Sequence, residues 1–448
     1  MIHTLKVTLK QHTPLIHFQH DQDGATLRAS EVKPKLDKYL FEKAIDESFD
    51  ECKTFLKDYS DKNENTLRRK YTQEGFRALD YKISINPINR IELSLHPHYD
   101  NERRKYVSDL FPMILSNMGG KDSIDELADF SMYDRVDVTF NSKSEDLIDM
   151  IADWSDLFFA TNNFGQRQDK GFGSFSVIEV DGEVRVFPKD DLPDNTRFLK
   201  LSLSPRAEEF EKQMQLFQTI DFYWKCLKSG INYTKKRDQV FPERYIKAFL
   251  WTYLNNKGQT WEKRRVKESF GLTTGEEKPE NINTLSFARA ILGCPDKFEY
   301  KNKGKTVSIG HTSAKESTDY IARIPSPIIF KPVFEGNTVR VYLLIDETAV
   351  CQLKQSNNLS FAFECEHKTI QIDINPNIVD FHDLLKGYHS YLAKKIKLKA
   401  FNYDGESDEY SENNSLEGKS WFIPLDFNWN RIIKSNQCWV EMYILNKK

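Results

Sequence analysis

One pattern occurs twice in this chain of 448 residues: a short run in which apolar and polar residues alternate, closed by a proline. The run 5–9 alternates before Pro14, and the run 199–203 does the same before Pro205. Alternation with a period of two is typical of a strand that is buried on one face only. Two such openings, far apart in the sequence, indicate two domains of the same kind.

The pattern that follows the first opening alternates between strand and helix signals. We expect a helix at about 25–57, strands at 81–85 and 91–95, a strand at 136–140, a helix at 147–158 and a strand at 175–178. Asn86-Pro87 separates two of these strands, which is typical of a hairpin turn. Pro34 must lie in an early turn of the first helix or break it. The resulting order is β-α-β-β-α-β, the split βαβ unit of ferredoxin-like folds.

The second half of the chain repeats this order with extra helical sequence inside it. We expect a strand at 199–203, helices within 206–270 and at 285–292, strands at 328–330 and 339–345, a helix at 381–392 and a strand at 395–399. The sequence therefore predicts an α+β protein with two tandem ferredoxin-like (RRM-like) domains. Their expected ranges are 1–190 and 191–448, with a helical insertion at about 206–280 in the second.

Composition limits the function classes. Hydrophobic residues make up 39% of the chain, which supports real cores, and the net charge of −3 excludes binding of polyanions through overall charge. A local basic groove stays compatible with this balance. The sequence has no run of 18 apolar residues, so we expect no membrane span. The alternating pattern starts directly after Met1, which is unlike a secretory signal. Six scattered cysteines without a Cys-x-x-Cys pair indicate a reduced, cytoplasmic protein, and we expect no metal and no cofactor.

The stretch 164–174, Phe-Gly-Gln-Arg-Gln-Asp-Lys-Gly-Phe-Gly-Ser, carries the clearest functional signal. Its glycines permit close approach to a ligand, its cations and exposed N–H groups suit phosphates, and Phe164 or Phe172 could stack on a base. It is neither a Walker loop nor a dinucleotide fingerprint, since it precedes a strand. A glycine-rich turn with incidental charges is the alternative. The candidate binding residues of this loop are Gly165, Arg167, Lys170, Gly171, Phe172 and Gly173.

A glycine-rich, basic loop at this place resembles the RAMP superfamily of CRISPR-associated RNA-binding proteins. The turn Thr13-Pro14-Leu15, the basic helix 27–36 and the strand that starts at Ser326-Pro327 resemble further parts of that superfamily. Two fused RAMP domains with a helical insertion look most like the head-end subunit, on the 3′ side of the crRNA, of type III-B (Cmr-type) effector complexes. Gln166 and Gln168 depart from the family pattern, in which basic residues are common.

The resemblance implies a non-catalytic subunit that grips guide RNA in an antiviral CRISPR complex. Its implied partners are crRNA, with or without target RNA, and other RAMP subunits. RNA held by its backbone requires Arg and Lys, with aromatic rings for splayed bases. Outside the loop, the candidate RNA-binding residues are Arg28, Lys33 and Lys35 on the first helix and Arg264 and Arg265 in a second basic cluster. A solvated helix face is the alternative explanation for each cluster.

Two other functions fit the sequence. A metal-independent endoribonuclease that processes CRISPR repeats would need a general base, and His17 and His20 are the best candidates. A ferredoxin-like interaction scaffold without any RNA role is also compatible with the near-neutral charge. Arg289, on an otherwise apolar helix, fits either a buried ion pair or an RNA contact, and the acidic stretch 404–417 fits a solvated loop.

Overall fold

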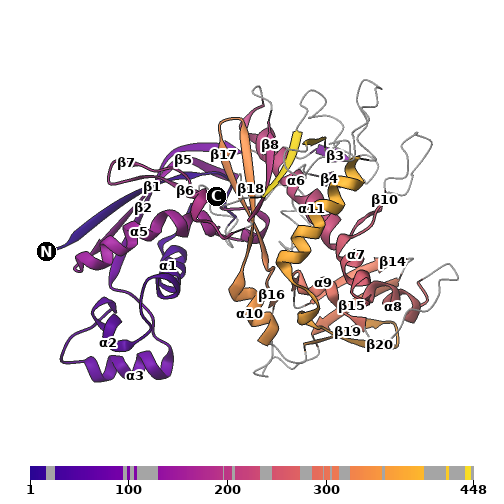
Figure 1. The fold of residues 1–448 in the computed structure, drawn as a ribbon, viewed down its shortest axis with the longest axis horizontal. Helices are drawn as coiled ribbons and strands as arrows, with labels where there is room; N and C mark the ends of the chain where they lie inside the picture. Colours follow the sequence, from indigo (N-terminus) through magenta and orange to yellow (C-terminus); the bar gives the residue numbers. More distant parts are fainter. Residues whose placement is uncertain are drawn as a thin grey trace.

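The computed structural model describes residues 1–16, 26–93, 98–100, 105–107, 130–194, 196–203, 207–232, 245–272, 285–295, 297–302, 305–311, 323–355, 359–397, 420–422 and 439–444. In these ranges the chain forms two α+β units, each with a five-stranded antiparallel sheet (Figure 1). None of the helices in the described ranges has the length and apolar character needed to cross a membrane.

The first unit has the strand order β2-β5-β1-β6-β7. Its elements are β1 (His3–Gln11), α1 (Ala29–Lys43), β2 (Tyr81–Leu93), β5 (Phe130–Ser142), α5 (Glu145–Thr161), β6 (Phe175–Val180) and β7 (Glu183–Val184). Leu5, Val7 and Leu9 are buried, as the alternation predicted. Ser144 caps α5 by accepting a hydrogen bond from the N–H of Leu147 (3.2 Å). The predicted order β-α-β-β-α-β is confirmed here.

The hairpin predicted at Asn86-Pro87 is wrong, because β2 runs through it as one strand. Pro87 lies opposite Val136 of β5. A proline lacks the N–H that a central strand needs, but β2 is the edge strand of its sheet and has a partner on one side only. The edge position therefore lets a proline stand inside a regular strand.

The single helix predicted at 25–57 is also wrong. Helix α1 starts after Arg28 and ends at Lys43, with the exposed Pro34 inside it. A small helical arm follows, with α2 (Phe49–Cys52), a 3-10 turn (Lys53–Phe55) and α3 (Glu64–Glu74) below the first sheet in Figure 1. Gly75 ends α3 in the left-handed conformation (φ 67°), which is the usual way to stop a helix.

The second unit has the strand order β17-β18-β8-β22-β21. Its elements are β8 (Arg197–Ser202), α6 (Glu209–Lys228), β17 (Ile328–Glu335), β18 (Thr338–Ile345), α11 (Phe381–Lys397), β21 (Ser420–Phe422) and β22 (Trp439–Ile444). The first four strands of each order correspond one to one. The strand predicted at 395–399 is wrong, since α11 continues to Lys397 and β22 takes the place of the fourth strand. The acidic stretch 404–417 lies outside the described residues.

In the range 206–280 of the predicted helical insertion, the described helices are α6, α7 (Phe249–Asn256) and α8 (Glu262–Ser269), and the short helix α9 (Ala288–Ile291) follows that range. The sequence did not reveal a four-stranded sheet of β14 (Lys297–Asn302), β15 (Lys305–His311), β19 (Ser360–Cys365) and β20 (Lys368–Asp373), or the helix α10 (Glu347–Gln355). Short strand pairs complete the described part: β3 (His98–Asp100), β4 (Lys105–Val107), β9 (Ile231–Asn232), β10 (Tyr245–Ile246), β11 (Thr260–Trp261), β12 (Leu285–Ser286), β13 (Cys294–Pro295) and β16 (Arg323–Ile324).

The two units meet along β17, which is the edge strand of the second sheet. Three of its carbonyl groups, on alternate residues, accept hydrogen bonds from side chains of the first unit. The bonds run from Asn163 Nδ2 to Phe330 (2.8 Å), from Ser174 Oγ to Pro332 (2.6 Å) and from Lys10 Nζ to Phe334 (3.2 Å). We call this contact the seam. Alternate residues of an edge strand point their polar groups outward, so side chains take the place of a neighbouring strand.

A buried histidine completes the seam. His12 Nδ1 accepts a hydrogen bond from the N–H of Phe334 (3.0 Å), and Nε2 contacts Ser176 Oγ (2.8 Å). Burial lowers the pKa of His12 well below its ordinary value of 6.5, and the charges of Lys10 and Lys331 lower the pKa further. The seam therefore holds His12 in its neutral form, since a protonated ring has no lone pair to accept the N–H.

This predicts a loss of stability in mild acid. The unfolded chain takes up a proton on His12 near pH 6.5 and the folded chain does not, so the free energy of unfolding falls as the pH drops below 6.5. The substitution His12→Gln should flatten this fall by up to about 1.4 kcal/mol per pH unit. Urea unfolding between pH 7 and pH 5 measures the slope. His382→Gln, at an exposed site on α11, is the control, and equal slopes in the two variants would contradict the prediction.

Candidate nucleic-acid interface

The glycine-rich loop (residues 164–174) joins α5 to β6 and is anchored in both hydrophobic cores. Phe164 packs in the core of the first unit, 5.6 Å from Phe159 between ring centroids. Phe172 lies in the core of the second unit, stacked on Phe217 at 4.0 Å. Both rings are fully buried, so the prediction that one of them stacks on a base is wrong. Each ring instead fixes one end of the loop, through burial that stabilises by roughly 1.5–3 kcal/mol per side chain.

The three glycines are required by close packing of the chain against itself. A Cβ on Gly173 would lie 1.9 Å from the carbonyl oxygen of Phe164, and one on Gly165 would lie 2.6 Å from that of Ile16. A Cβ on Gly171 would lie 3.0 Å from Pro332, across the seam. All three have positive φ values, of 64° to 91°. The predicted close approach is therefore to neighbouring backbone and to the second unit.

Backbone N–H groups of the loop are largely used inside the chain. Gly165 donates to Glu31 Oε1 (2.6 Å), Gln166 to the carbonyl of Ile16 (2.7 Å) and Gly173 to that of Pro14 (2.9 Å). The N–H groups of residues 164, 170, 171 and 174 also donate within the chain. The expectation that these N–H groups cradle a phosphate is contradicted at these positions. At these positions, contact with a ligand must come from side chains.

Helix α1 and the loop form one surface, as expected. Lys35 Nζ donates to the carbonyl of Asn163 (2.9 Å) and to Gln168 Oε1 (2.5 Å), and it lies 3.4 Å from Glu31 Oε1. Burial lowers the pKa of Lys35, and the charge of Glu31 partly offsets this. Lys35 therefore brings positive charge to the loop while it holds the loop against the helix.

The two cations of the loop lie around its 3-10 turn, and they differ in their surroundings. Arg167 is partly exposed and adopts a left-handed backbone conformation (φ 53°) just before the 3-10 turn Gln168–Lys170. Lys170 pairs with Asp169 (2.8 Å), and its ammonium lies 3.4 Å from the ring centroid of Trp224 on α6. Sequence reasoning missed Trp224. A cation over an indole face is attracted by the ring.

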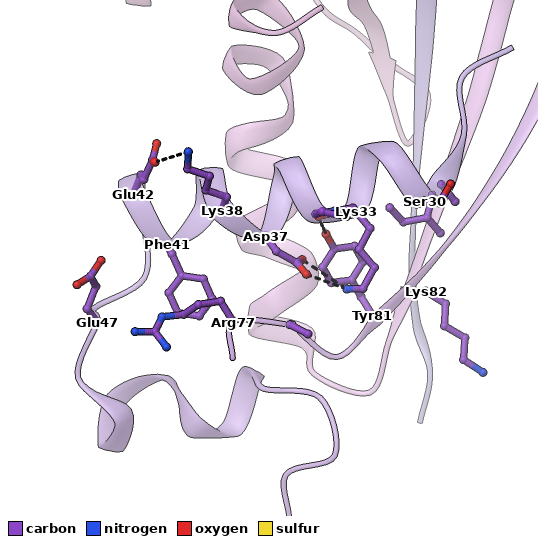
Figure 2. Close-up of a pocket in the computed structure, with 14 residues that line it drawn as sticks. Ser30, Lys33, Asp37, Lys38, Phe41, Glu42, Glu47, Arg77, Tyr81 and Lys82 are labelled. Atoms are coloured by element: carbon purple, nitrogen blue, oxygen red, sulfur yellow. Dashed lines mark hydrogen bonds and ion pairs between the residues drawn. The ribbon is translucent and has the colours of Figure 1, made fainter. Parts of the chain in front are cut away.

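Lys33 lies on α1 beside Asp37 and Tyr81 (Figure 2). It lines a cavity of about 890 Å³ between α1 and the segment that leads into β2. Its ammonium donates to the carbonyl of Leu79 (2.7 Å), pairs with Asp37 (3.4 Å) and lies 3.5 Å from the Tyr81 ring centroid. The structure thus does not bring Lys33 together with Lys35. An RNA contact by Lys33 stays a prediction.

The structure describes the side chains of only some of the remaining candidate RNA-binding residues. Arg28 is the partly exposed N-cap residue of α1, one turn before Glu31. Arg264 and Arg265 belong to α8, but their side chains lie outside what the structure describes. Arg289 Nε donates to the fully buried carboxylate of Glu262 at the start of α8, which supports the ion-pair interpretation of Arg289.

The nuclease candidates His17 and His20 lie outside the described residues. Among the residues that the structure does describe, no group of three or more His, Cys, Asp or Glu side chains is placed to hold a metal ion. Sequence reasoning also missed the seam residues His12, Ser174 and Lys331. For Lys331 a signal existed, since a single lysine interrupts the apolar strand 328–334.

Two α+β units with a glycine-rich loop packed on a basic first helix define a protein of the RAMP superfamily, the RNA-binding class of CRISPR-associated proteins. Family comparisons make the assignment finer. The model of the Cmr1 N-terminal domain matches residues 2–231, more than half of the chain, and that of the Cmr1 C-terminal domain matches residues 245–408. The chain belongs to the Cmr1 family.

Several solved structures are similar to this chain. Cmr1 from Pyrococcus furiosus, in its apo form, is 13% identical over 76% of this chain and 87% of that one, with a TM-score of 0.31. A chain of the type III-B Cmr-beta complex bound to cognate target RNA and AMPPnP is 10% identical over 86% and 98%, with a TM-score of 0.30. A chain of the Cmr-beta complex bound to cognate target RNA is 12% identical over 40% and 60%, with a TM-score of 0.24. No curated protein sequence matches. The family assignment depends on the two domain matches.

The packing of the loop predicts that Gly173 tolerates no side chain. Gly173→Ala combines a left-handed φ with a clash against backbone and should lower the free energy of unfolding by about 3 kcal/mol or more. Gly182→Ala is the matched control. Gly182 also has a positive φ (89°), but a Cβ added there would meet no atom within 4 Å, so only the conformational cost of about 1 kcal/mol is expected. Urea unfolding compares the two, and equal losses would show that the loop can move away from the added Cβ.

Proposed function

We propose that this chain is a non-catalytic RNA-binding subunit of a type III-B CRISPR effector complex in antiviral defence. It grips the backbone of guide RNA, alone or paired with target RNA, through the cations of the glycine-rich loop and the N-terminal part of α1. Arg28, Lys35, Arg167 and Lys170 are its proposed phosphate contacts, and Arg264 and Arg265 extend the path. Its proposed partners are the other RAMP subunits of the complex.

The observation that carries this proposal is the contact between α1 and the glycine-rich loop. Two segments more than 100 residues apart, which the sequence singled out independently, are joined by Lys35 and Glu31 into one basic surface. The family assignment agrees with it, as do the solved Cmr-beta complexes, which hold target RNA. A near-neutral chain then binds a polyanion by local charge, which suits a subunit that must recognise RNA at one place.

The fold supports the same proposal. We infer that both units are ferredoxin-like RAMP domains, since their first four strands have the same order and their elements follow β-α-β-β-α-β. The division at 190/191 falls between β7 and β8 and stays a prediction. The placement on the 3′ side of the guide RNA, which the resemblance implies, is also part of the proposal.

Loss of the two loop cations should change how RNA binding depends on salt. Each phosphate contact releases counterions, so the double variant Arg167→Ala, Lys170→Ala should bind single-stranded RNA more weakly and flatten the slope of log K against log salt by roughly one to two units. Fluorescence anisotropy over a salt series measures both quantities. Lys62→Ala, at an exposed turn before α3, is the matched control and should leave the slope unchanged.

An unchanged slope in the double variant would remove the loop from the RNA site. Purification of the tagged chain from its host, followed by sequencing of the RNA that accompanies it, tests the function as a whole. Recovery of repeat-derived RNA with other RAMP subunits supports the proposal, whereas recovery of the chain alone favours an interaction scaffold. Crosslinks between this chain and the guide RNA locate it, and crosslinks confined to the 5′ end would correct the 3′ placement.

A further inference from the structure

We propose that Lys331, on the edge strand of the second unit, is the positioning residue of the glycine-rich loop, so that the RNA-binding surface of the first unit is complete only when the second unit is docked. This inference rests on the proposed function and adds to it a residue and a dependence between domains. Lys331 is not itself a proposed RNA contact. It acts through the backbone on which Arg167 and Lys170 are carried.

The geometry of the Lys331 side chain is the first argument. Its ammonium crosses the seam and donates to two carbonyl groups of the first unit, those of Asn162 (2.8 Å) and Phe175 (2.7 Å). These two residues flank the loop on its two sides. One side chain of the second unit therefore contacts both ends of an 11-residue loop, beside the hydrogen bond from the N–H of Phe164 to the carbonyl of Gly173 (2.9 Å) that joins those ends within the first unit.

Neighbouring bonds hold the same two ends. Asn163 Nδ2 donates both to the carbonyl of Gln168 inside the loop (2.7 Å) and to the carbonyl of Phe330 (2.8 Å). At the other end, Ser174 Oγ donates to the carbonyl of Pro332 (2.6 Å). Residues 330, 331 and 332 of β17 thus hold the loop at 162–163 and at 174–175.

The energetics show that this lysine is costly to keep. Lys331 is fully buried, and within the described part of the chain both of its hydrogen-bond acceptors are neutral carbonyl oxygens. Burial lowers the pKa of Lys331 well below 10.5, and the nearby charge of Lys35 lowers it further. In its charged form such a lysine would destabilise the fold, because neither acceptor is a carboxylate. A polyanion beside Lys35 would offset the repulsion between that charged form and Lys35.

The variant Lys331→Met tests this role. Methionine keeps an unbranched side chain but removes both donated hydrogen bonds, which weakens the hold of the second unit on the two loop ends. Single-stranded RNA labelled with fluorescein should bind this variant about tenfold more weakly, while the slope against salt stays near that of the parent, because the phosphate contacts themselves remain. Hydrogen exchange of the amides of residues 164–174 should be faster. Both readouts are taken where circular dichroism shows the full chain to be folded.

Lys10→Met is the matched control. Lys10 crosses the same seam and donates to the carbonyl of Phe334 on the same strand, at a distance of two residues from the part of β17 that holds the loop ends. It should leave RNA affinity within about twofold of the parent. If Lys331→Met does not fold, Ser174→Ala replaces it in the test. This substitution removes the hydrogen bond to the carbonyl of Pro332 at one loop end with little change in volume. It should weaken RNA binding about threefold.

The outcomes separate the two proposals. Parent affinity and loop exchange in both Lys331→Met and Ser174→Ala would overturn the positioning role while leaving RNA binding intact. An equal loss in Lys10→Met would overturn it too, because the effect would then come from the seam in general. Absence of salt-dependent RNA binding by the parent chain would overturn the proposed function itself.

Discussion

Strand β17 ends the second sheet with outward-pointing carbonyl groups that have no neighbouring strand, and the first unit supplies the missing donors from side chains. An unpaired edge normally invites pairing with another chain. Here Asn163, Ser174 and Lys10 occupy the acceptors at every second residue, and Pro332 removes one N–H from the edge altogether. The two sheets are thus joined without merging into one. The position of the glycine-rich loop, the two cores that meet at it and the surface around α1 all follow from this edge.

The loop shows how one segment can serve two domains. Phe164 belongs to one core and Phe172 to the other, so the loop cannot relax without disturbing both. At its three glycines an added Cβ would lie 1.9 to 3.0 Å from neighbouring atoms, so these positions admit no side chain. Rigidity of this kind suits a surface that recognises a regular polyanion, because little conformational entropy is lost when the ligand binds. Three of the cations predicted for RNA, Lys33, Lys35 and Lys170, also hold bonds within the chain, so these residues both carry charge and stabilise the fold.

Local pattern predicted the larger part of the fold. Alternation in 5–9 and 199–203 identified the first strand of each unit, and the order of elements followed from it. Errors arose where tertiary structure overrode a local pattern. Asn86-Pro87 predicted a turn, but Pro87 lies inside β2, where the edge position tolerates a proline. The site was predicted in outline only. The joining of α1 to the loop was expected, but the roles of the glycines, of Phe172 and of Lys331 depend on contacts with residues distant in sequence, and a lysine among apolar residues does not reveal which carbonyl groups it will meet.

Lys331 and Asn162 are separated by 169 residues along the chain, so Lys331 is synthesised well after the loop. At roughly 5–20 residues per second, the loop leaves the ribosome on the order of ten to thirty seconds before the strand that ties its ends. During that interval the first unit has its sheet and helices, but its loop lacks the hydrogen bonds from β17. If the proposed positioning role of Lys331 holds, a nascent chain surrounded by ribosomal and messenger RNA carries an incomplete RNA site until the second unit closes the seam.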